Sequence, residues 1–210
     1  MNELQSLTQS VLLAVFGVSF ALGFISQRTH FCTMGAIADV VNMEDWTRAR
    51  QWLLAIGVAM LGFAALSDQG QIDASKSLYA SNRFMWLSTL VGGLMFGYGM
   101  VIASGCANKA LVRIGGGNLK SVVVFMTMGL SAFATMKGLT AVLRVNTVDT
   151  MAIDMPAGAS LTALAGGNWV AYVLGAVLIL AVLRHKDAWS LENLLAGLGV
   201  GGLVVGMWWI

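Results

Sequence analysis

The stretch ISQRTHFCTMGAIADVV, from Ile25 to Val41, places polar and charged residues between two hydrophobic runs. Arg28 and His30 interrupt the first run, and Cys32 begins the second, shorter run CTMGAIADVV. Because a polar break inside an apolar region favours the end of a helix, we expect a long helix before the break and a short helix that starts at the thiol. The meaning of this break depends on whether the surrounding helices lie in water or in lipid.

The composition indicates lipid. Of the 210 residues, 58% are hydrophobic and only 10% are charged, and the mean hydropathy is +0.78. A soluble domain has roughly 25% charged residues. Glycine, which is frequent in membrane helices, occurs 25 times. Hydrophobic runs recur to the last residue, which excludes a signal peptide as their explanation, and their strength excludes a β-barrel. We therefore predict an all-α integral membrane protein.

Six segments are candidates for membrane-spanning helices, which need roughly 20 mainly apolar residues. They are Thr8–Ser26, Trp52–Ser67, Phe84–Ala103, Leu119–Leu143, Trp169–Leu183 and Leu191–Ile210. Two further stretches, Phe31–Val41 and Cys106–Ile114, are too short to span. We predict that these two are re-entrant half-helices carrying the cysteines, within a single transmembrane domain covering residues 1–210 with about five to six spans.

The distribution of lysine and arginine gives an orientation, because these residues mark cytoplasmic loops. Eight of the twelve basic residues fall on one side if the half-helices add no crossing. They are Arg28, Arg48, Arg50, Lys109, Arg113, Lys120, Arg184 and Lys186. This topology places the N-terminus outside the cytoplasm.

The chain contains an internal repeat. GFISQRTHFC, residues 23–32, and GYGMVIASGC, residues 97–106, both begin with glycine and an aromatic residue and end in cysteine. Ala36 and Ala110 follow four residues after the two cysteines. Each unit, 8–67 and 84–143, consists of span, cysteine, half-helix, loop and span, which predicts a parallel repeat. The last segment resembles the first, so an inverted second half is expected to begin near Trp189, as in transporters built from inverted repeats.

Cys32 and Cys106 are the main candidates for chemistry. The N-terminal end of a helix offers unpaired N–H groups and a partial positive charge, which favour anions. A thiol adds a soft, weak S–H donor. One cysteine alone is more often a packing residue. Two cysteines at the same place in a repeat favour a shared function.

Polar neighbours of the two thiols form a supporting set of candidate site residues: Arg28, His30, Thr33, Ser104, Asn108 and Lys109. The cations either form a vestibule that concentrates anions or only fix the orientation of the chain. Orientation is the favoured role for Arg113 and Lys120. Asp39, near the end of the first half-helix, is expected to reach water.

Closely spaced glycines on two spans predict close helix packing. They are Gly92, Gly93, Gly97 and Gly99 on one span, and Gly197, Gly199, Gly201, Gly202 and Gly206 on another. Two cysteines in separate units and two distant histidines, His30 and His185, make a poor zinc site. We predict neither a metal nor a cofactor.

The two cysteine motifs, RTHFCTMGAIADVV and ASGCANKALVRIGGGNLKSVVVF, resemble those of the YeeE/YedE family, the sulfur-transport domain family of bacterial inner-membrane proteins. Members are implicated in thiosulfate uptake, and some are linked to selenium metabolism. The resemblance implies that Cys32 and Cys106 lie at the constriction of an hourglass-shaped protein. There they would pass thiosulfate along by transient S–H contacts.

The sequence departs from the fused members of that family, which have an inverted second half with a further pore cysteine. This chain ends within what resembles the first helix of that half. By the resemblance, it is either a shortened form or one part of a pore completed by a second chain or copy.

The leading hypothesis is a multi-pass transporter, or part of one, in the bacterial inner membrane for a sulfur-containing anion, with thiosulfate first. Three alternatives remain: a membrane enzyme handling thiols or persulfides, a selenium-metabolism membrane protein, and a non-transporting assembly subunit. The lack of a CxxC motif and the raised pKa expected of a buried thiol argue against an enzyme. The expected partners are the anion, the lipid bilayer, a second chain or copy and a cytoplasmic sulfur-carrier protein, but not a nucleic acid.

Overall fold

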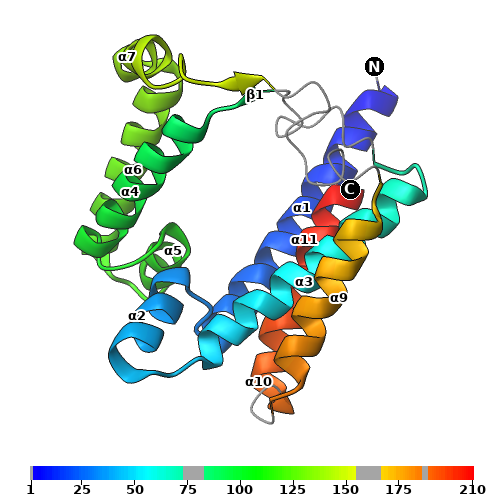
Figure 1. Cartoon of the computed structure of the whole chain (residues 1–210). Helices are drawn as coiled ribbons and strands as arrows, with labels where there is room; N and C mark the ends of the chain where they lie inside the picture. The colour runs from blue at the N-terminus through cyan, green and yellow to red at the C-terminus, as the bar shows by residue number, and fades with distance from the viewer. Residues whose placement is uncertain (1, 73–82, 155–166, 186–188) are drawn as a thin grey trace. The chain divides into compact units, whose positions relative to one another are not determined.

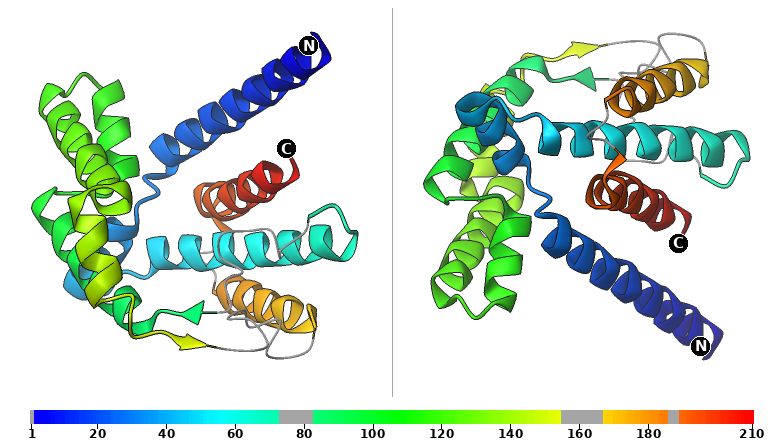
Figure 2. Two further views of the ribbon diagram at one scale, coloured as in Figure 1. Left: turned by 90° about the horizontal axis from the view of Figure 1, so that it is seen from above. Right: turned by 90° about the horizontal axis from the view of Figure 1, so that it is seen from below.

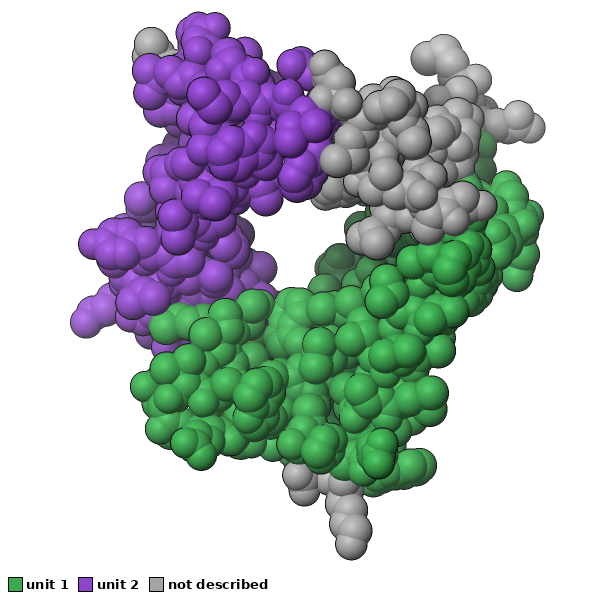
Figure 3. Space-filling view, in the orientation of Figure 1, with its two compact units in different colours: residues 1–77, 165–210 green, residues 78–164 purple. Residues whose placement is uncertain are grey.

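The computed structural model describes residues 2–72, 83–154, 167–185 and 189–210 (Figure 1). The chain divides into two compact units (Figure 3). Unit 1 consists of residues 1–77 and 165–210, and unit 2 consists of residues 78–164. Each unit contains one of the two predicted repeats, residues 8–67 and residues 84–143 respectively.

Unit 1 is built around one long helix, α3. Its elements are α1 (Asn2–Thr29), α2 (Thr33–Met43), α3 (Thr47–Asp68), α9 (Trp169–Leu183), α10 (Leu191–Leu194), the π-helical segment η3 (Leu195–Gly199) and α11 (Val200–Trp209). Helix α3 lies between α9 and α11 and contacts both (Figure 2). It also contacts α2 and η3. The helix that follows the first cysteine motif is therefore the centre of this unit.

In its described residues, 83–154, unit 2 contains four helices and one short strand pair. Its elements are β1 (Arg83–Phe84), α4 (Trp86–Ile102), α5 (Ala107–Gly115), α6 (Leu119–Lys137), α7 (Leu139–Thr147) and β2 (Ile153–Asp154). Helix α5 packs on α6, and α6 packs on α7. The two strands pair antiparallel, with Arg83 opposite Asp154 and Phe84 opposite Ile153. No pattern in the sequence indicated this pairing, because each strand has only two residues.

The helices confirm the predicted fold class. Within the described residues, five helical segments are long and apolar enough to cross a membrane. Large apolar side chains such as Leu13, Phe16, Leu130 and Phe133 are 68–73% exposed, as suits a surface that faces lipid. Helix α9 has 15 residues and is about 22 Å long, less than the ~30 Å of a hydrocarbon core. Five helical segments are thus long enough to span and α9 is shorter, so the prediction of five to six spans holds.

One predicted span is interrupted. The segment Leu119–Leu143 forms two helices, α6 and α7, separated by Gly138. A β-carbon on Gly138 would lie 2.6 Å from the carbonyl oxygen of Ala134. The hydroxyl of Thr140 donates to that same oxygen at 2.7 Å. Glycine thus permits the break, and the carbonyl of Ala134 near the end of α6 accepts from this hydroxyl and also from the backbone N–H of Gly138 at 2.8 Å.

Glycines let α3 approach its neighbours closely. Of the glycines named in the contacts below, Gly201 is one for which the sequence predicted close packing. A β-carbon on Gly57 would lie 3.1 Å from the carbonyl oxygen of Gly175 on α9, and the reverse contact has the same length. A β-carbon on Gly201 of α11 would lie 2.8 Å from the carbonyl oxygen of Ala55. By contrast, a β-carbon on Gly202, or on any of the four α4 glycines, would meet no described atom within 4 Å.

The Gly57–Gly175 contact makes α3 sensitive to added volume. We expect Gly57→Val to lower the free energy of unfolding by about 2 kcal/mol, because a filled contact forces the helices apart. The matched control is Gly202→Val, which adds the same side chain in open space and is expected to stay within about 0.5 kcal/mol of the parent. Unfolding of the purified chain in detergent measures both. Equal stability of the two variants would contradict this packing.

Candidate functional site

Both cysteines occupy the same structural position, the residue directly before a short helix. Cys32 precedes α2 and Cys106 precedes α5, each with an extended backbone. The carbonyl oxygen of each cysteine accepts a hydrogen bond in the first turn, from Ala36 at 2.9 Å and from Ala110 at 3.0 Å. Ala36 and Ala110 are both buried. The two alanines that match in sequence therefore match in structure.

A left-handed residue lies two positions before each cysteine. His30 has φ 51° and Ser104 has φ 55°, a conformation that costs a non-glycine residue roughly 1–2 kcal/mol. The next N–H closes the end of the preceding long helix. Phe31 donates to the carbonyl five residues earlier at 3.2 Å, and Gly105 does the same at 3.1 Å. The two helix breaks thus share one geometry, whereas the parallel orientation of the repeats stays a prediction.

This geometry presents two helix N-termini beside thiols. The first N–H groups of a helix have no partner within the helix, and the aligned peptide dipoles give that end a partial positive charge. The first turns of α2 and α5 contain no acidic residue. Each cysteine therefore lies where a helix end favours a negative charge.

A pocket of about 260 Å³ opens beside Cys106 within unit 2. Its polar and charged lining consists of Ser104, Cys106, Arg113, Asn118, Lys120 and Ser121. The described lining contains two charged side chains, Arg113 and Lys120, and both are cations. The sequence favoured an orienting role for Arg113 and Lys120 and did not indicate that they lie beside the thiol. The amphipathic spacing of α5 could have indicated this for Arg113, because residues 106, 110 and 113 lie on one helical face.

The turn between α5 and α6 positions the two cations. Gly117 has φ 86°, which a glycine adopts without strain. The N–H of Asn118 donates to the carbonyl of Arg113 at 3.0 Å. The side-chain oxygen of Asn118 accepts from the N–H of Lys120 at 3.1 Å. Asn118 therefore caps the start of α6 and holds the backbone of Lys120 near the end of α5 that carries Arg113.

The surroundings of Cys32 in unit 1 are more closed. Cys32 is 6% exposed, and its neighbour Phe31 is also buried. The ring of Phe31 stacks on Trp52 of α3 with centroids 4.5 Å apart. A β-carbon on Gly35 would lie 3.6 Å from Cβ of Cys32 and 2.7 Å from Nη1 of Arg48. The guanidinium of Arg48 therefore lies close to the first cysteine motif.

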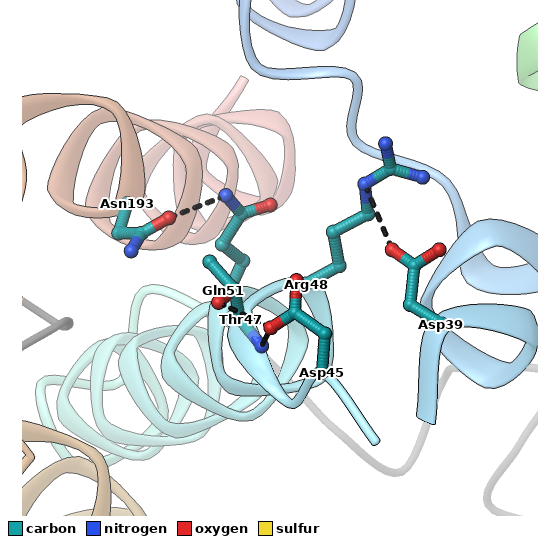
Figure 4. A network of polar contacts seen from close by, with 6 residues as sticks. All are labelled: Asp39, Asp45, Thr47, Arg48, Gln51 and Asn193. Atoms are coloured by element: carbon teal, nitrogen blue, oxygen red, sulfur yellow. Dashed lines mark hydrogen bonds and ion pairs between the residues drawn. The ribbon is translucent and has the colours of Figure 1, made fainter. Parts of the chain in front are cut away.

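Arg48 is paired with an acid on the first half-helix, Asp39. Its Nε lies 3.3 Å from Oδ2 of Asp39, and the Asp39 side chain is 19% exposed (Figure 4). That the end of this half-helix reaches water stays a prediction. Asp39 pairs with the first turn of α3. That turn begins with Thr47, whose hydroxyl and N–H donate to Asp45 at 2.6 Å and 2.9 Å and thereby hold the pKa of Asp45 below its ordinary value.

Unit 1 also contains a buried polar pair. The side-chain nitrogen of Gln51 donates to the side-chain oxygen of Asn193 at 2.6 Å and ties α3 to α10 (Figure 4). Within the described part of unit 1, three buried atoms have no hydrogen-bond partner: the Ser26 hydroxyl, the Gln51 carbonyl oxygen and the Trp52 indole nitrogen. The sequence analysis did not select these residues, although Gln51 and Asn193 stand out as polar residues next to apolar runs.

The supporting residues fall in different surroundings. Arg28 and His30 are exposed, and Thr33 is half-buried in the first turn of α2. Asn108 and Lys109 lie outside the residues that line the pocket, and the stem of Lys109 folds against Gly105. The functional roles of this set stay predictions. So does the relay between the two cysteines, since Cys32 belongs to unit 1 and Cys106 to unit 2.

Comparison with known proteins gives consistent matches. A family model described as "Sulphur transport" matches residues 28–209. Over 124 residues the chain is 35% identical to the thiosulfate transporter TsuA of Escherichia coli (strain K12), covering 59% of this chain and 34% of that protein. It is 29% identical to the thiosulfate transporter TsuA of Spirochaeta thermophila, covering 58% and 35%.

A third relative is named only as a probable transporter, YedE of Escherichia coli (strain K12), at 26% identity over 49% of this chain and 23% of that protein. The match spans about a third of the length of the two thiosulfate transporters. All three relatives are named as transporters and none as an enzyme.

The two left-handed residues can be tested directly. We expect His30→Gly and Ser104→Gly to keep or raise thermal stability, because glycine adopts positive φ without steric cost. We expect His30→Val and Ser104→Val to lower it by about 1–2 kcal/mol, because a β-branched residue fits this region poorly. Thermal unfolding of the purified chain measures all four. Valine variants as stable as their glycine counterparts would show that the breaks adopt another conformation.

Proposed function

Because this chain belongs to the sulphur transport family, we propose that it forms the cysteine-bearing part of a membrane transporter for a sulfur-containing anion, with thiosulfate as the first candidate. The family match also confirms the resemblance inferred from the two cysteine motifs. The observation that carries the proposal is the repeated geometry: in each unit, a long helix ends at a left-handed residue and a thiol begins a short helix.

The proposed mechanism is a non-covalent relay past Cys32 and Cys106. Helix N-termini attract the anion through their N–H groups and dipoles. Each S–H donates weakly to the anion, and a polarisable sulfur suits the soft terminal sulfur of thiosulfate. Because conduction requires release as well as entry, the contact at each thiol has to be weak.

The names and organisms of the relatives support the choice of thiosulfate as the anion and of the bacterial inner membrane as the location. Two of them carry thiosulfate in their names, and all three come from bacteria. The apolar surfaces of the described helices suit a lipid environment. We therefore propose the bacterial inner membrane as the location and thiosulfate uptake as the activity.

Replacing the cysteines tests the relay. We expect Cys32→Ser and Cys106→Ser to retain part of the initial rate of ³⁵S-thiosulfate uptake, because a hydroxyl still donates. We expect Cys32→Ala and Cys106→Ala to lose about tenfold, since an alanine offers the anion no hydrogen-bond donor. The assay uses cells with no other thiosulfate uptake, and rates are normalised to the amount of protein in the membrane.

Met34→Leu is the matched control, because it removes a sulfur from the turn next to Cys32 without removing a thiol, and it should leave uptake unchanged. Normal uptake by both alanine variants would leave the thiols with a packing role and overturn the proposal. Complete loss in the serine variants as well, together with a trappable mixed disulfide or persulfide, would instead indicate thiol chemistry.

A further inference from the structure

The pocket beside Cys106 has two chemically different ends. Helix α5 lines it with Cys106, Ala110 and Arg113, which lie on one helical face at positions i, i+4 and i+7. Seven residues along a helix span about 10 Å. Cys106 therefore lies at one end of this face and Arg113 at the other. Asn118, which joins the end of α5 to the start of α6, places the backbone of Lys120 near the Arg113 end.

The charge of this pocket differs from that of the site around Cys32. Beside Cys32, the guanidinium of Arg48 is paired with the carboxylate of Asp39 at 3.3 Å, so the two charges compensate. In the Cys106 pocket, the charged residues among the described lining are Arg113 and Lys120. A pocket lined by two cations and the donors of Ser104 and Ser121 fits an anion with more than one negative charge.

The size of the pocket suits a small polyatomic anion. One water molecule occupies about 30 Å³ in the liquid, so a volume of about 260 Å³ holds such an anion together with several waters. Arg113 offers several donors in a planar fork that matches oxyanion geometry, whereas a thiol is a soft, weak donor. An anion with a hard oxygen end and a soft sulfur end has a complementary partner at each end of this pocket.

We propose that the Cys106 pocket binds thiosulfate in one orientation, with its oxygens toward Arg113 and Lys120 and its terminal sulfur toward Cys106. In this arrangement the cations select for an oxyanion, and the thiol distinguishes thiosulfate from sulfate. The inference rests on the proposed function for the identity of the anion. It assigns anion recognition to Arg113 and Lys120, for which the sequence analysis had favoured an orienting role.

Equilibrium binding of ³⁵S-thiosulfate and ³⁵S-sulfate to the purified full chain in lipid nanodiscs tests this arrangement. Arg113→Gln and Lys120→Gln are each expected to weaken the binding of both anions by about fivefold at low salt, with the ratio of the two affinities unchanged. The loss should shrink as ionic strength rises, because salt screens charges. Cys106→Ala is expected to weaken thiosulfate binding more than sulfate binding, so that the ratio falls.

Two sets of controls separate recognition from folding and from net charge. Lys120→Arg keeps the charge and should bind both anions within about twofold of the parent. Arg113→Lys keeps the charge but loses the planar fork, so its binding should fall between that of the parent and that of Arg113→Gln. Lys137→Gln removes the same charge from the far end of α6, about 25 Å along the helix from Lys120, and should leave binding unchanged. An equal loss in Lys137→Gln would show that only net charge matters.

Three other results would overturn the inference: glutamine variants that bind both anions normally, a Cys106→Ala variant with an unchanged ratio, or a parent chain that binds neither anion at millimolar concentration. Its failure is distinguishable from failure of the proposed function. Cysteine-dependent uptake without any effect of Arg113 or Lys120 on binding would overturn this inference alone. The expected binding pattern without cysteine-dependent uptake would overturn transport alone.

Discussion

A helix that ends inside a membrane protein must pair its last carbonyl groups, because lipid offers them no hydrogen bonds. Both long helices that precede the cysteines meet this requirement in the same way. His30 and Ser104 take the left-handed conformation, and the next N–H turns back to a carbonyl five residues earlier. The chain then continues extended through the cysteine and begins a new helix. The position of each thiol follows from this way of ending a helix.

The same backbone geometry supports two different electrostatic surroundings. In unit 1, the short helix packs against the start of α3, where Arg48 and Asp39 compensate each other. In unit 2, the start of α6 brings Lys120 to a pocket that already contains Arg113. A repeated scaffold can thus hold one thiol in a neutral, closed site and the other in a cationic, open site. Such a difference suits a pathway whose steps require unequal affinity.

Much of the fold could be predicted from the sequence, because membrane helices depend on composition and length. The break before Cys32 and the helix after it were visible as a polar interruption, and the second cysteine motif repeated it. The interruption at Gly138 was not predicted, since a glycine within an apolar run is usually a packing residue. At this break the carbonyl of Ala134 accepts from both the N–H of Gly138 and the hydroxyl of Thr140.

The candidate site was predictable only in part. The cysteines are rare residues at equivalent positions, so the sequence alone selected them. The neighbours of the thiols depend on how separate helices pack. Arg48 reaches the first motif from α3, and Lys120 reaches the second from α6. Because lysine and arginine also mark the cytoplasmic side of membrane proteins, their identity alone did not indicate that they lie near the thiols.

The proposed relay requires both thiols to contact the anion, so thiosulfate should protect both from alkylation. The chain has two cysteines, so mass spectrometry of membrane vesicles treated with N-ethylmaleimide reports each site separately. We expect saturating thiosulfate to slow the alkylation of both Cys32 and Cys106, and equal concentrations of sulfate to slow it less. Alkylation rates that thiosulfate leaves unchanged at both cysteines would contradict the relay.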